Sequence, residues 1–368
     1  MRLLLIKAGF PYYESPKVYK WVWVFIMLPF LDEYSLNDLI KKHGKVLRNV
    51  YRILNKYPQA FEKLLHTLTI PVFFELLAEF ESAKNETAKS RKRLELVIDD
   101  TQGEKMGKCM EFIHKLFDHC KDRYIMGYNF VFVLVIRGED VFPLSMMLWL
   151  PKKHKDHRTK IEMSRDFINT LKKEGDKRQA TLKDVDITFD SAYYKNKLIK
   201  AVDNADLRLV SKPSNTFKFE FEDEFLHPKE ITEKVKNRSW NQLEDRVFYQ
   251  RVAVKHPDHG NVVLIVRKKY LDDGKIIYDV LVCNKRFFKA HWIHKRYKRR
   301  WEIECHFKYY KQYLNLGKSQ FRKLGSIRSH LYCVAMAGLI VALYRQKSKR
   351  KISFRRAVKL ITNELRET

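Results

Sequence analysis

The sequence has few cysteines and few residues that break regular structure: 5 cysteines, 12 glycines and 10 prolines in 368 residues. The cysteines are scattered, odd in number and include no Cys-x-x-Cys pair, so a disulfide framework is not expected. A reducing, cytoplasmic environment fits this pattern. Four neighbouring side chains are of metal-binding types, but their spacing matches no common zinc module, so no zinc site is predicted there. They are Cys109, His114, His119 and Cys120.

The sequence also lacks a long apolar segment near its amino terminus. The run from Trp21 to Leu31 is too short to span a bilayer and contains Pro29, and no signal-peptide cleavage pattern precedes it. We therefore expect no membrane partner and a cytoplasmic protein.

Acidic residues are scarce relative to basic ones. The chain has 73 Lys and Arg against 44 Asp and Glu, a net charge of +29 spread over its whole length. Such an excess indicates an extended polyanionic partner, and nucleic acid is the default candidate. On charge alone, a protein that sits on acidic membranes or ribosomes is the alternative. The length and the 45% of hydrophobic residues favour a globular protein of two or three domains.

Residues 1–92 are predicted to form a helical region that binds DNA. Residues 35–56 have the spacing of two short amphipathic helices about Gly44, with Ser35 as the first N-cap, which indicates a helix-turn-helix. An ordinary helical hairpin with a solvated basic face is the alternative. The second helix would present four basic side chains to a groove or the backbone of double-stranded DNA. These are Lys45, Arg48, Arg52 and Lys56.

An α/β (α+β) core follows, beginning near Arg93. Strand patterns alternate with helical ones in the order β-β-β-α-β-α over residues 93–212, with a hairpin at Gly138 and a helix over 160–173. This is the order of an RNase H-like core. Residues 213–275 read as a β-rich insertion with hairpin turns at HPDHGN and LDDGK. The catalytic core resumes at 276–318, and 319–368 form a helical, basic C-terminal region.

Two acids end predicted core strands: Asp99 follows LELVI, and Asp190 follows DITF. Adjacent parallel strands would bring the two carboxylates together. Converging carboxylates can hold divalent cations that activate a water or a 3′-hydroxyl, and their hard oxygens suit magnesium or manganese. Taken singly, each acid is equally explained as the cap of the next helix.

A long basic helix predicted from His291 to about Leu314 carries a third acid. Tyr297 is followed at offsets of 3, 7 and 14 residues by Arg300, Glu304 and Lys311. At about 100° per residue, the four side chains share one narrow stripe, so a carboxylate lies among groups that bind phosphate. A solvated basic helix with one i,i+4 ion pair is the alternative.

The pattern Y-x2-R-x3-E-x6-K resembles the motif of DDE transposases of the insertion-sequence-four family, and IDDT and FDSAY are similar to that family's strand ends. The resemblance implies an RNase H-like catalytic core with a β-strand insertion. It also implies two Mg²⁺ or Mn²⁺ ions held by Asp99, Asp190 and Glu304, and cut-and-paste transposition by a homodimer on paired DNA ends. The family register favours Asp99 over Asp100, since neighbouring strand residues face opposite sides.

Trp301, directly after Arg300, resembles an aromatic residue that stacks on a displaced base in such enzymes; the alternative is a core anchor. All three acids and the basic stripe are present, which favours an active transposase that cleaves DNA and transfers strands. Two other functions remain open: a domesticated, transposase-derived DNA-binding protein, and an RNase H-like DNA nuclease without strand transfer.

Overall fold

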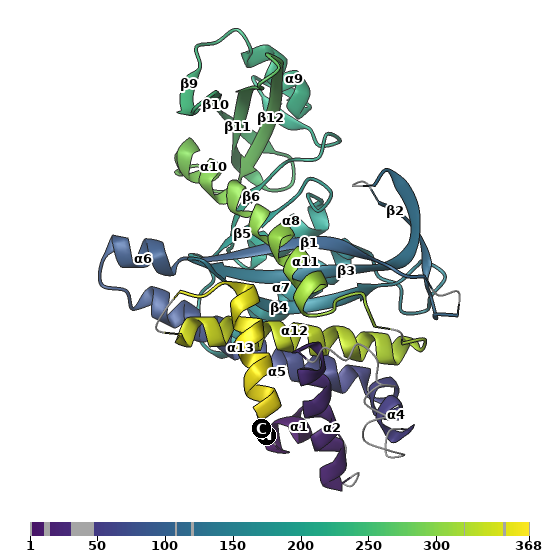
Figure 1. Ribbon diagram of the computed structural model, residues 1–368. Coiled ribbons are helices and arrows are strands. Elements are labelled where there is room, and N and C mark those ends of the chain that lie inside the picture. The colour runs from purple at the N-terminus through teal and green to yellow at the C-terminus, as the bar shows by residue number, and fades with distance from the viewer. Residues whose placement is uncertain are drawn as a thin grey trace. The chain divides into compact units, whose positions relative to one another are not determined.

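The computed structural model describes residues 2–10, 15–30, 48–106, 109–118, 121–319, 321–348 and 351–367 of a mixed α/β protein (Figure 1). The chain divides into two compact units. The first unit comprises Met1–Lys92, Asp100–Thr159 and Ile303–Thr368, and the second comprises Arg93–Asp99 and Lys160–Glu302. Strand β1 (Leu94–Glu104) and helix α11 (Trp301–Tyr313) belong partly to each unit.

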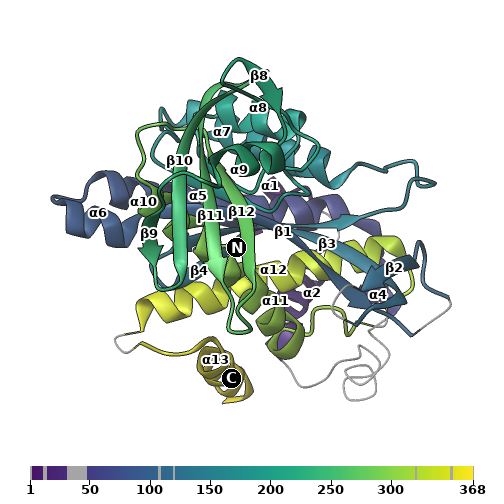
Figure 2. The same cartoon turned by 90° about the horizontal axis from the view of Figure 1, so that it is seen from above.

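The second unit is built on a mixed sheet. The first residues of β1 pair in parallel with β5, and β5 pairs in parallel with β6. Three antiparallel strands continue the sheet beyond β6, and Figure 2 shows them side by side. Both short parallel strands are buried at every residue, as expected for strands covered on both faces. The strands are β5 (Asp186–Phe189), β6 (Arg208–Ser211), β10 (Val247–His256), β11 (Gly260–Tyr270) and β12 (Ile276–Cys283).

The helices of the second unit follow the predicted pattern, with one addition. The predicted helix at 160–173 is α7, and the helical spacing after Asp190 forms α8. The addition is α9 in the insertion, where Pro228 occupies the first turn and His227 and Glu230 form a capping box. The helices are α7 (Lys160–Lys177), α8 (Asn196–Asn204), α9 (Pro228–Val235) and α10 (Ala290–Arg299).

The insertion is rich in strands, as its sequence predicts. The turn signals HPDHGN and LDDGK join β10 to β11 and β11 to β12, and each contains a glycine with positive φ, Gly260 at +70° and Gly274 at +77°. Glycine adopts this backbone at no steric cost, because it has no Cβ atom. Three shorter strands complete this part: β7 (Phe219–Phe221), β8 (Glu224–Leu226) and β9 (Asn241–Glu244).

The first unit packs helices against an antiparallel sheet. The predicted hairpin at Gly138 joins β3 to β4, and the half-buried β2, which its short polar sequence did not predict, pairs with β3. Helices α5 and α12 lie against β4 (Figure 1). The elements are β2 (His114–Asp118), β3 (Arg123–Arg137), β4 (Asp140–Trp149), α5 (Pro58–Glu81) and α12 (Leu324–Lys347).

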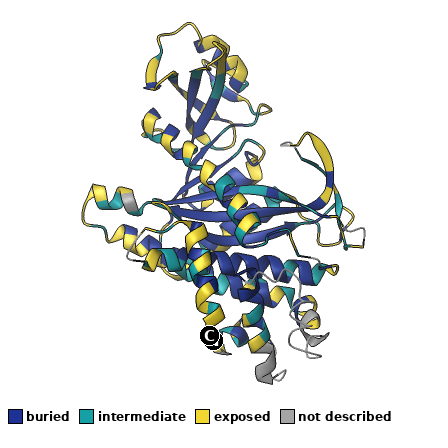
Figure 3. Ribbon diagram, in the orientation of Figure 1, coloured by how far each residue is buried: buried dark blue, intermediate teal, exposed yellow. Residues whose placement is uncertain are grey.

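Helix α12 is long and apolar enough to cross a membrane, but 83% of its apolar window is buried inside the protein. Figure 3 shows the buried residues along most of its length. We therefore interpret α12 as a core helix of the first unit. Shorter helices complete the unit: α1 (Arg2–Lys7), α2 (Ser15–Met27), η1 (Leu28–Phe30), α4 (Arg48–Lys56), α6 (Glu86–Lys92) and α13 (Phe354–Glu367).

A glycine lets α12 approach α11 closely. A Cβ atom added at Gly338 would lie 1.9 Å from the hydroxyl oxygen of Tyr310, a residue that is 1% exposed. Tyr310 and Phe307 also contact Phe132 of β3, with ring centroids 5.6 and 5.0 Å apart. These contacts fix the part of α11 that carries Glu304.

The predicted helix-turn-helix is described only in part. Residues 31–47, which include the first helix and Lys45, lie outside the described residues. The second helix is α4; Leu54 is buried, its carbonyl accepts a hydrogen bond from the Ser329 hydroxyl at 2.6 Å, and Arg52 is exposed. The backbone of Arg48 is helical. DNA binding by this region stays a prediction.

A buried network of charges ties α10 to three strands of the second unit. Glu95 of β1 and Asp186 of β5 are both 0% exposed. Asp186 lies 2.7 Å from Arg208 Nε of β6 and 3.0 Å from Arg296 Nε of α10. Arg296 and Arg299 approach Glu95 at 3.7 Å. Burial raises the pKa of Glu95 to about 8, against the opposing pull of the two arginines.

The pKa of Glu95 yields a prediction about stability. Because the folded-state pKa exceeds that of the unfolded chain, the folded protein retains a proton at pH values where the unfolded chain has lost it. Stability from this group is therefore lost as the pH rises from about 5 to about 8, by up to about 1.4 kcal/mol per pH unit. Glu95→Gln, which is neutral throughout, should flatten this slope in urea unfolding. The exposed Glu233→Gln is the control; equal slopes for the Glu95→Gln and native proteins would contradict the prediction.

Candidate active site

Two acids meet at one edge of the sheet in the second unit. The parallel register pairs Ile98 of β1 with Phe189 of β5, and the next residues are Asp99 and Asp190, the two strand-end acids at which this pairing ends. Strand β1 itself continues to Glu104, so the prediction that the strand ends at Asp99 is wrong, whereas β5 ends at Phe189 as predicted. Asp190 Oδ1 accepts hydrogen bonds from the backbone N–H groups of Ala192 at 2.9 Å and Tyr193 at 3.2 Å. The carboxylate is therefore held by the turn that follows its strand.

Arg300 connects this pair to the basic helix. Its Nη1 donates to Asp99 Oδ2 at 2.7 Å, and the two side chains are 19% and 14% exposed. The guanidinium carbon also lies 5.8 Å from the centre of the Tyr297 ring. The arginine therefore lies between an acid of β1 and the tyrosine of its own helix.

Tyr297 is surrounded by cations. Besides Arg300, Lys212 lies 5.9 Å and Arg267 lies 5.7 Å from the centre of its ring. Burial raises the pKa of Tyr297; Arg300 opposes this shift and the negative charge of Asp190 adds to it. The phenol is thus neutral and placed where both a strand-end acid and three cations act on it.

The sequence analysis did not identify Lys212 or Arg267. Lys212 directly follows β6, the neighbour of β5, and Arg267 follows the apolar residues of β11 as the first of three consecutive basic residues. Asp279 holds Arg267 with two contacts of 2.6 Å and lies 3.3 Å from Lys212. Although burial raises the pKa of Asp279, Arg267 and Lys269 lower it to about 2. Asp279 is therefore ionised and fixes Arg267 in place.

Asp100 has a different partner from Asp99. Its Oδ2 accepts a hydrogen bond of 2.9 Å from Asn129 Nδ2, and both residues belong to the first unit. The two neighbouring acids therefore differ in surroundings, as alternate residues of a strand do.

Glu304 and Lys311 belong to α11 in the first unit. Glu304 is half-buried, and Lys311 Nζ donates to Thr101 Oγ1 of β1 at 2.8 Å. The predicted long helix is formed by α10 and α11, separated only by Arg300, whose φ and ψ of −51° and −30° are helical. The structure thus groups Asp99, Asp190, Tyr297 and Arg300 in one unit and places Glu304 and Lys311 in the other.

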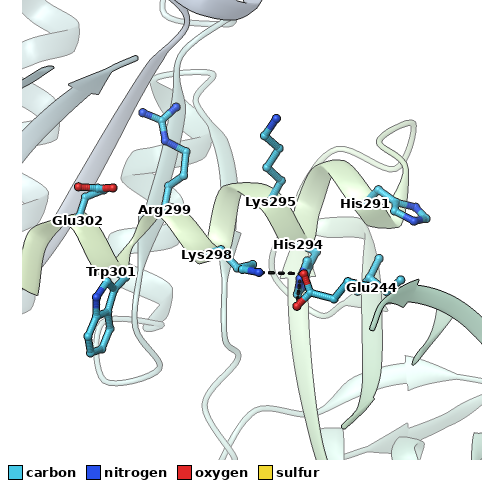
Figure 4. A pocket seen from close by; sticks show the side chains of 9 residues that line it. Glu244, His291, His294, Lys295, Lys298, Arg299, Trp301 and Glu302 are labelled. Carbon is cyan, nitrogen blue, oxygen red and sulfur yellow. Dashed lines mark hydrogen bonds and ion pairs between the residues drawn. The ribbon is translucent and has the colours of Figure 1, made fainter. Parts of the chain in front are cut away.

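A cavity of about 450 Å³ lies beside α10 (Figure 4). Glu244 holds one side of it, through Lys298 Nζ at 2.8 Å and His294 Nε2 at 3.2 Å. Trp301 lines the cavity and is 59% exposed, so it is not an anchor of the core. The lining residues are Leu243, Glu244, His291, His294, Lys295, Lys298, Arg299, Trp301 and Glu302.

Comparison with protein families decides the class. A model described as "Transposase DDE domain" matches residues 90–340, which is more than half of the chain and includes all three acids. The chain belongs to this transposase family. Its function is DNA transposition, which makes DNA its substrate, and divalent metal ions are general to the family.

Other comparisons add little to the family assignment. No curated protein matches the chain. One similar solved structure is the NurA nuclease from Sulfolobus solfataricus, with 10% identity over 82% of this chain and 95% of that one. Its TM-score of 0.28 is too low to support an argument.

The exposure of Trp301 yields a second prediction. Trp301→Ala should change the free energy of unfolding by no more than about 0.5 kcal/mol, because the ring has little core packing to lose. Trp292, on the same segment, stacks on Phe288 at a centroid distance of 3.7 Å and packs on the core of the second unit. Trp292→Ala should cost about 2 kcal/mol or more. Urea unfolding of both variants tests this contrast. If Trp301→Ala lowered the free energy of unfolding as much as Trp292→Ala, Trp301 would be a core residue and the prediction would be wrong.

Proposed function

We propose that this transposase cleaves DNA at the ends of an insertion sequence and transfers the strands to a target, with Asp99, Asp190 and Glu304 as its catalytic acids. The observation that carries the proposal is the parallel register that places Asp99 beside Asp190, with Arg300 of the Tyr-Arg-Glu-Lys motif on Asp99. A strand-end acid and a motif residue 201 positions apart in the chain are in direct contact. This contact brings the motif to the acid of β1 and thereby supports the proposal.

The side chains present fit divalent metal ions. Asp99 and Asp190 offer hard carboxylate oxygens where the parallel pairing of β1 and β5 ends, the ligand type that Mg²⁺ and Mn²⁺ prefer. With Glu304 they would hold two ions. Bound there, the ions would activate a water or 3′-hydroxyl and stabilise the leaving oxygen.

The cations around Tyr297 would hold the phosphate that is cleaved. Arg300 is a planar donor suited to phosphate oxygens, and Lys212 adds a compact charge. Arg267 is 2% exposed and bound by Asp279 and His294, so it would act on the phosphate through its charge and not by direct contact. In the DNA-free protein, Arg300 instead neutralises Asp99. Lys311, on the same motif stripe, would bind the backbone farther along the DNA.

The cavity beside α10 suits the end of a DNA duplex. Trp301 presents an exposed aromatic ring next to Lys295, Lys298 and Arg299. An unpaired base can stack on such a ring while the cations contact its phosphate, which offsets the loss of base pairing. We assign Trp301 this role. The basic helix α4, with Arg48 and Arg52, would add contacts to double-stranded DNA, together with Lys45.

On the basis of the Tyr-Arg-Glu-Lys spacing, we also propose that the chain is a member of the insertion-sequence-four group. It would then act by cut and paste, as a homodimer on paired DNA ends. A DNA nuclease without strand transfer is the second candidate, since the acids alone support cleavage. Strand joining separates the two: a transposase gives joined products, and the nuclease gives only cut ones.

Removal of any one acid should abolish the chemistry but not the binding of DNA. Asp99→Asn, Asp190→Asn and Glu304→Gln should each lower cleavage and strand transfer by about 100-fold or more. Binding of duplex DNA should persist or strengthen, because each variant loses a negative charge next to the phosphates. Cleavage and joining are measured with Mg²⁺ or Mn²⁺ on DNA that carries the sequences flanking the reading frame.

Asp100→Asn is the matched control, since it removes the same charge from the adjacent residue, which contacts Asn129. It should retain activity within a few-fold. Loss of activity in Asp100→Asn with retention in Asp99→Asn would reverse the assignment on β1. Full activity in Glu304→Gln would refute the role of the third acid.

A further inference from the structure

Three metal-binding side chains gather at the turn between β10 and β11. His256, Asp258 and His259 each offer one ligand atom, and these atoms all lie within 4.8 Å of one another. All three belong to the second unit and are separate in sequence from the strand-end acids. The cluster therefore calls for an explanation of its own.

The two imidazoles are buried with unsatisfied nitrogens. His256 is 1% exposed, and the side chain of His259 is 7% exposed. The Nε2 atom of each ring is buried and has no hydrogen-bond partner among the described residues. The rings lie 4.6 Å apart at 61°. Buried polar atoms in folded proteins normally have a partner. Two neighbouring imidazole nitrogens without one therefore indicate that a ligand binds between them.

The surrounding residues orient the cluster. Asp203 of α8 lies 2.7 Å from His259 Nδ1 through Oδ2, and its Oδ1 accepts a hydrogen bond of 3.1 Å from Asn284. A carboxylate that accepts the Nδ1 proton leaves a lone pair on Nε2, the arrangement that precedes binding of a metal by histidine. Asn196 Nδ2 donates to Asp258 Oδ2 at 2.5 Å. Asn196 and Asp203 of α8 therefore hold Asp258 and His259, two of the three ligands. Asn284, which follows β12, in turn holds Asp203.

We propose that His256, Asp258 and His259 bind one transition-metal ion, with Zn²⁺ the best match. Two imidazoles and a carboxylate are a common zinc set, and a water would complete a tetrahedron. The strand-end acids differ in kind, since their all-oxygen ligands suit Mg²⁺. The Asp258 amide donates to His256 Nδ1 at 3.1 Å, so His256 Nε2 carries the ring proton without the ion. When the ion binds Nε2, this proton must move to Nδ1, and the hydrogen bond from the Asp258 amide is lost.

The ion would hold the β10–β11 hairpin to the body of the second unit. The ligands lie on the hairpin turn, whereas Asp203 and Asn196 belong to α8 and Asn284 follows β12. A metal at this point therefore stabilises the end of the insertion against the helix that follows Asp190. Its role is structural, and it does not depend on the proposed chemistry of the strand-end acids.

The test is zinc binding by the full-length protein after treatment with a chelator, in excess Mg²⁺ to occupy the strand-end acids. Calorimetry with Zn²⁺ should show one ion per chain, and Co²⁺ should give the visible absorption bands of a tetrahedral site. Asp258→Asn and His259→Gln should abolish tight binding. Asp203→Asn should weaken it about 10- to 100-fold, because the orientation of His259 is lost.

Matched controls separate the site from general effects. Asp273→Asn, on the next hairpin turn, and His227→Gln, at the start of α9, should bind zinc as the native protein does. Zinc should raise the melting temperature of the native protein but not that of Asp258→Asn. Because the Asp258 side chain is exposed, this variant should fold normally, and circular dichroism checks that it does. The proposal would be overturned if the native protein did not bind zinc, or if His259→Gln and Asp258→Asn bound zinc as tightly as the native protein.

Discussion

The position of helix α10 depends on two acids that are buried among arginines. Glu95 and Asp186 lie inside the second unit on adjacent strands, and Arg296 of the helix reaches both. Removing one partner of such a network leaves an uncompensated buried charge, which is far more costly than replacing the whole set by apolar residues. Because Arg296 precedes Tyr297 and Arg300, the network that fixes the helix also fixes the motif residues at the strand ends.

The cations of this arrangement have acidic partners in the protein without DNA. Arg300 pairs with Asp99, while Asp279 contacts Arg267, Lys212 and Lys269 and balances only part of their charge. A phosphate and divalent ions bring charges of both signs and can replace Arg300 at Asp99 without leaving either group unpaired. The net charge of +29 adds long-range attraction for DNA, which salt weakens through counterion release.

The sequence predicts the parts of this protein that depend on local patterns. The apolar segments that precede Asp99 and Asp190, the hairpin at Gly138 and the helical spacing of the motif each follow from neighbouring residues, and the structure has the corresponding elements, although β1 continues past Asp99 to Glu104. The polar β2 has no such pattern and pairs only because β3 lies beside it. Lys212 and Arg267 reach Tyr297 through the order of strands in the sheet, which one sequence does not encode locally. For the same reason HPDHGN reads as a turn, while its contacts with Asp203 emerge only in the fold.

The most direct test of the central claim is the anomalous scattering of manganese in crystals of the full-length protein grown with Mn²⁺ and DNA ends. Two peaks roughly 4 Å apart are expected, bounded by the carboxylates of Asp99, Asp190 and Glu304. Arg300 should then contact a phosphate in place of Asp99. Manganese bound elsewhere, or at Asp99 and Asp190 with Glu304 on a separate surface, would contradict the two-metal account.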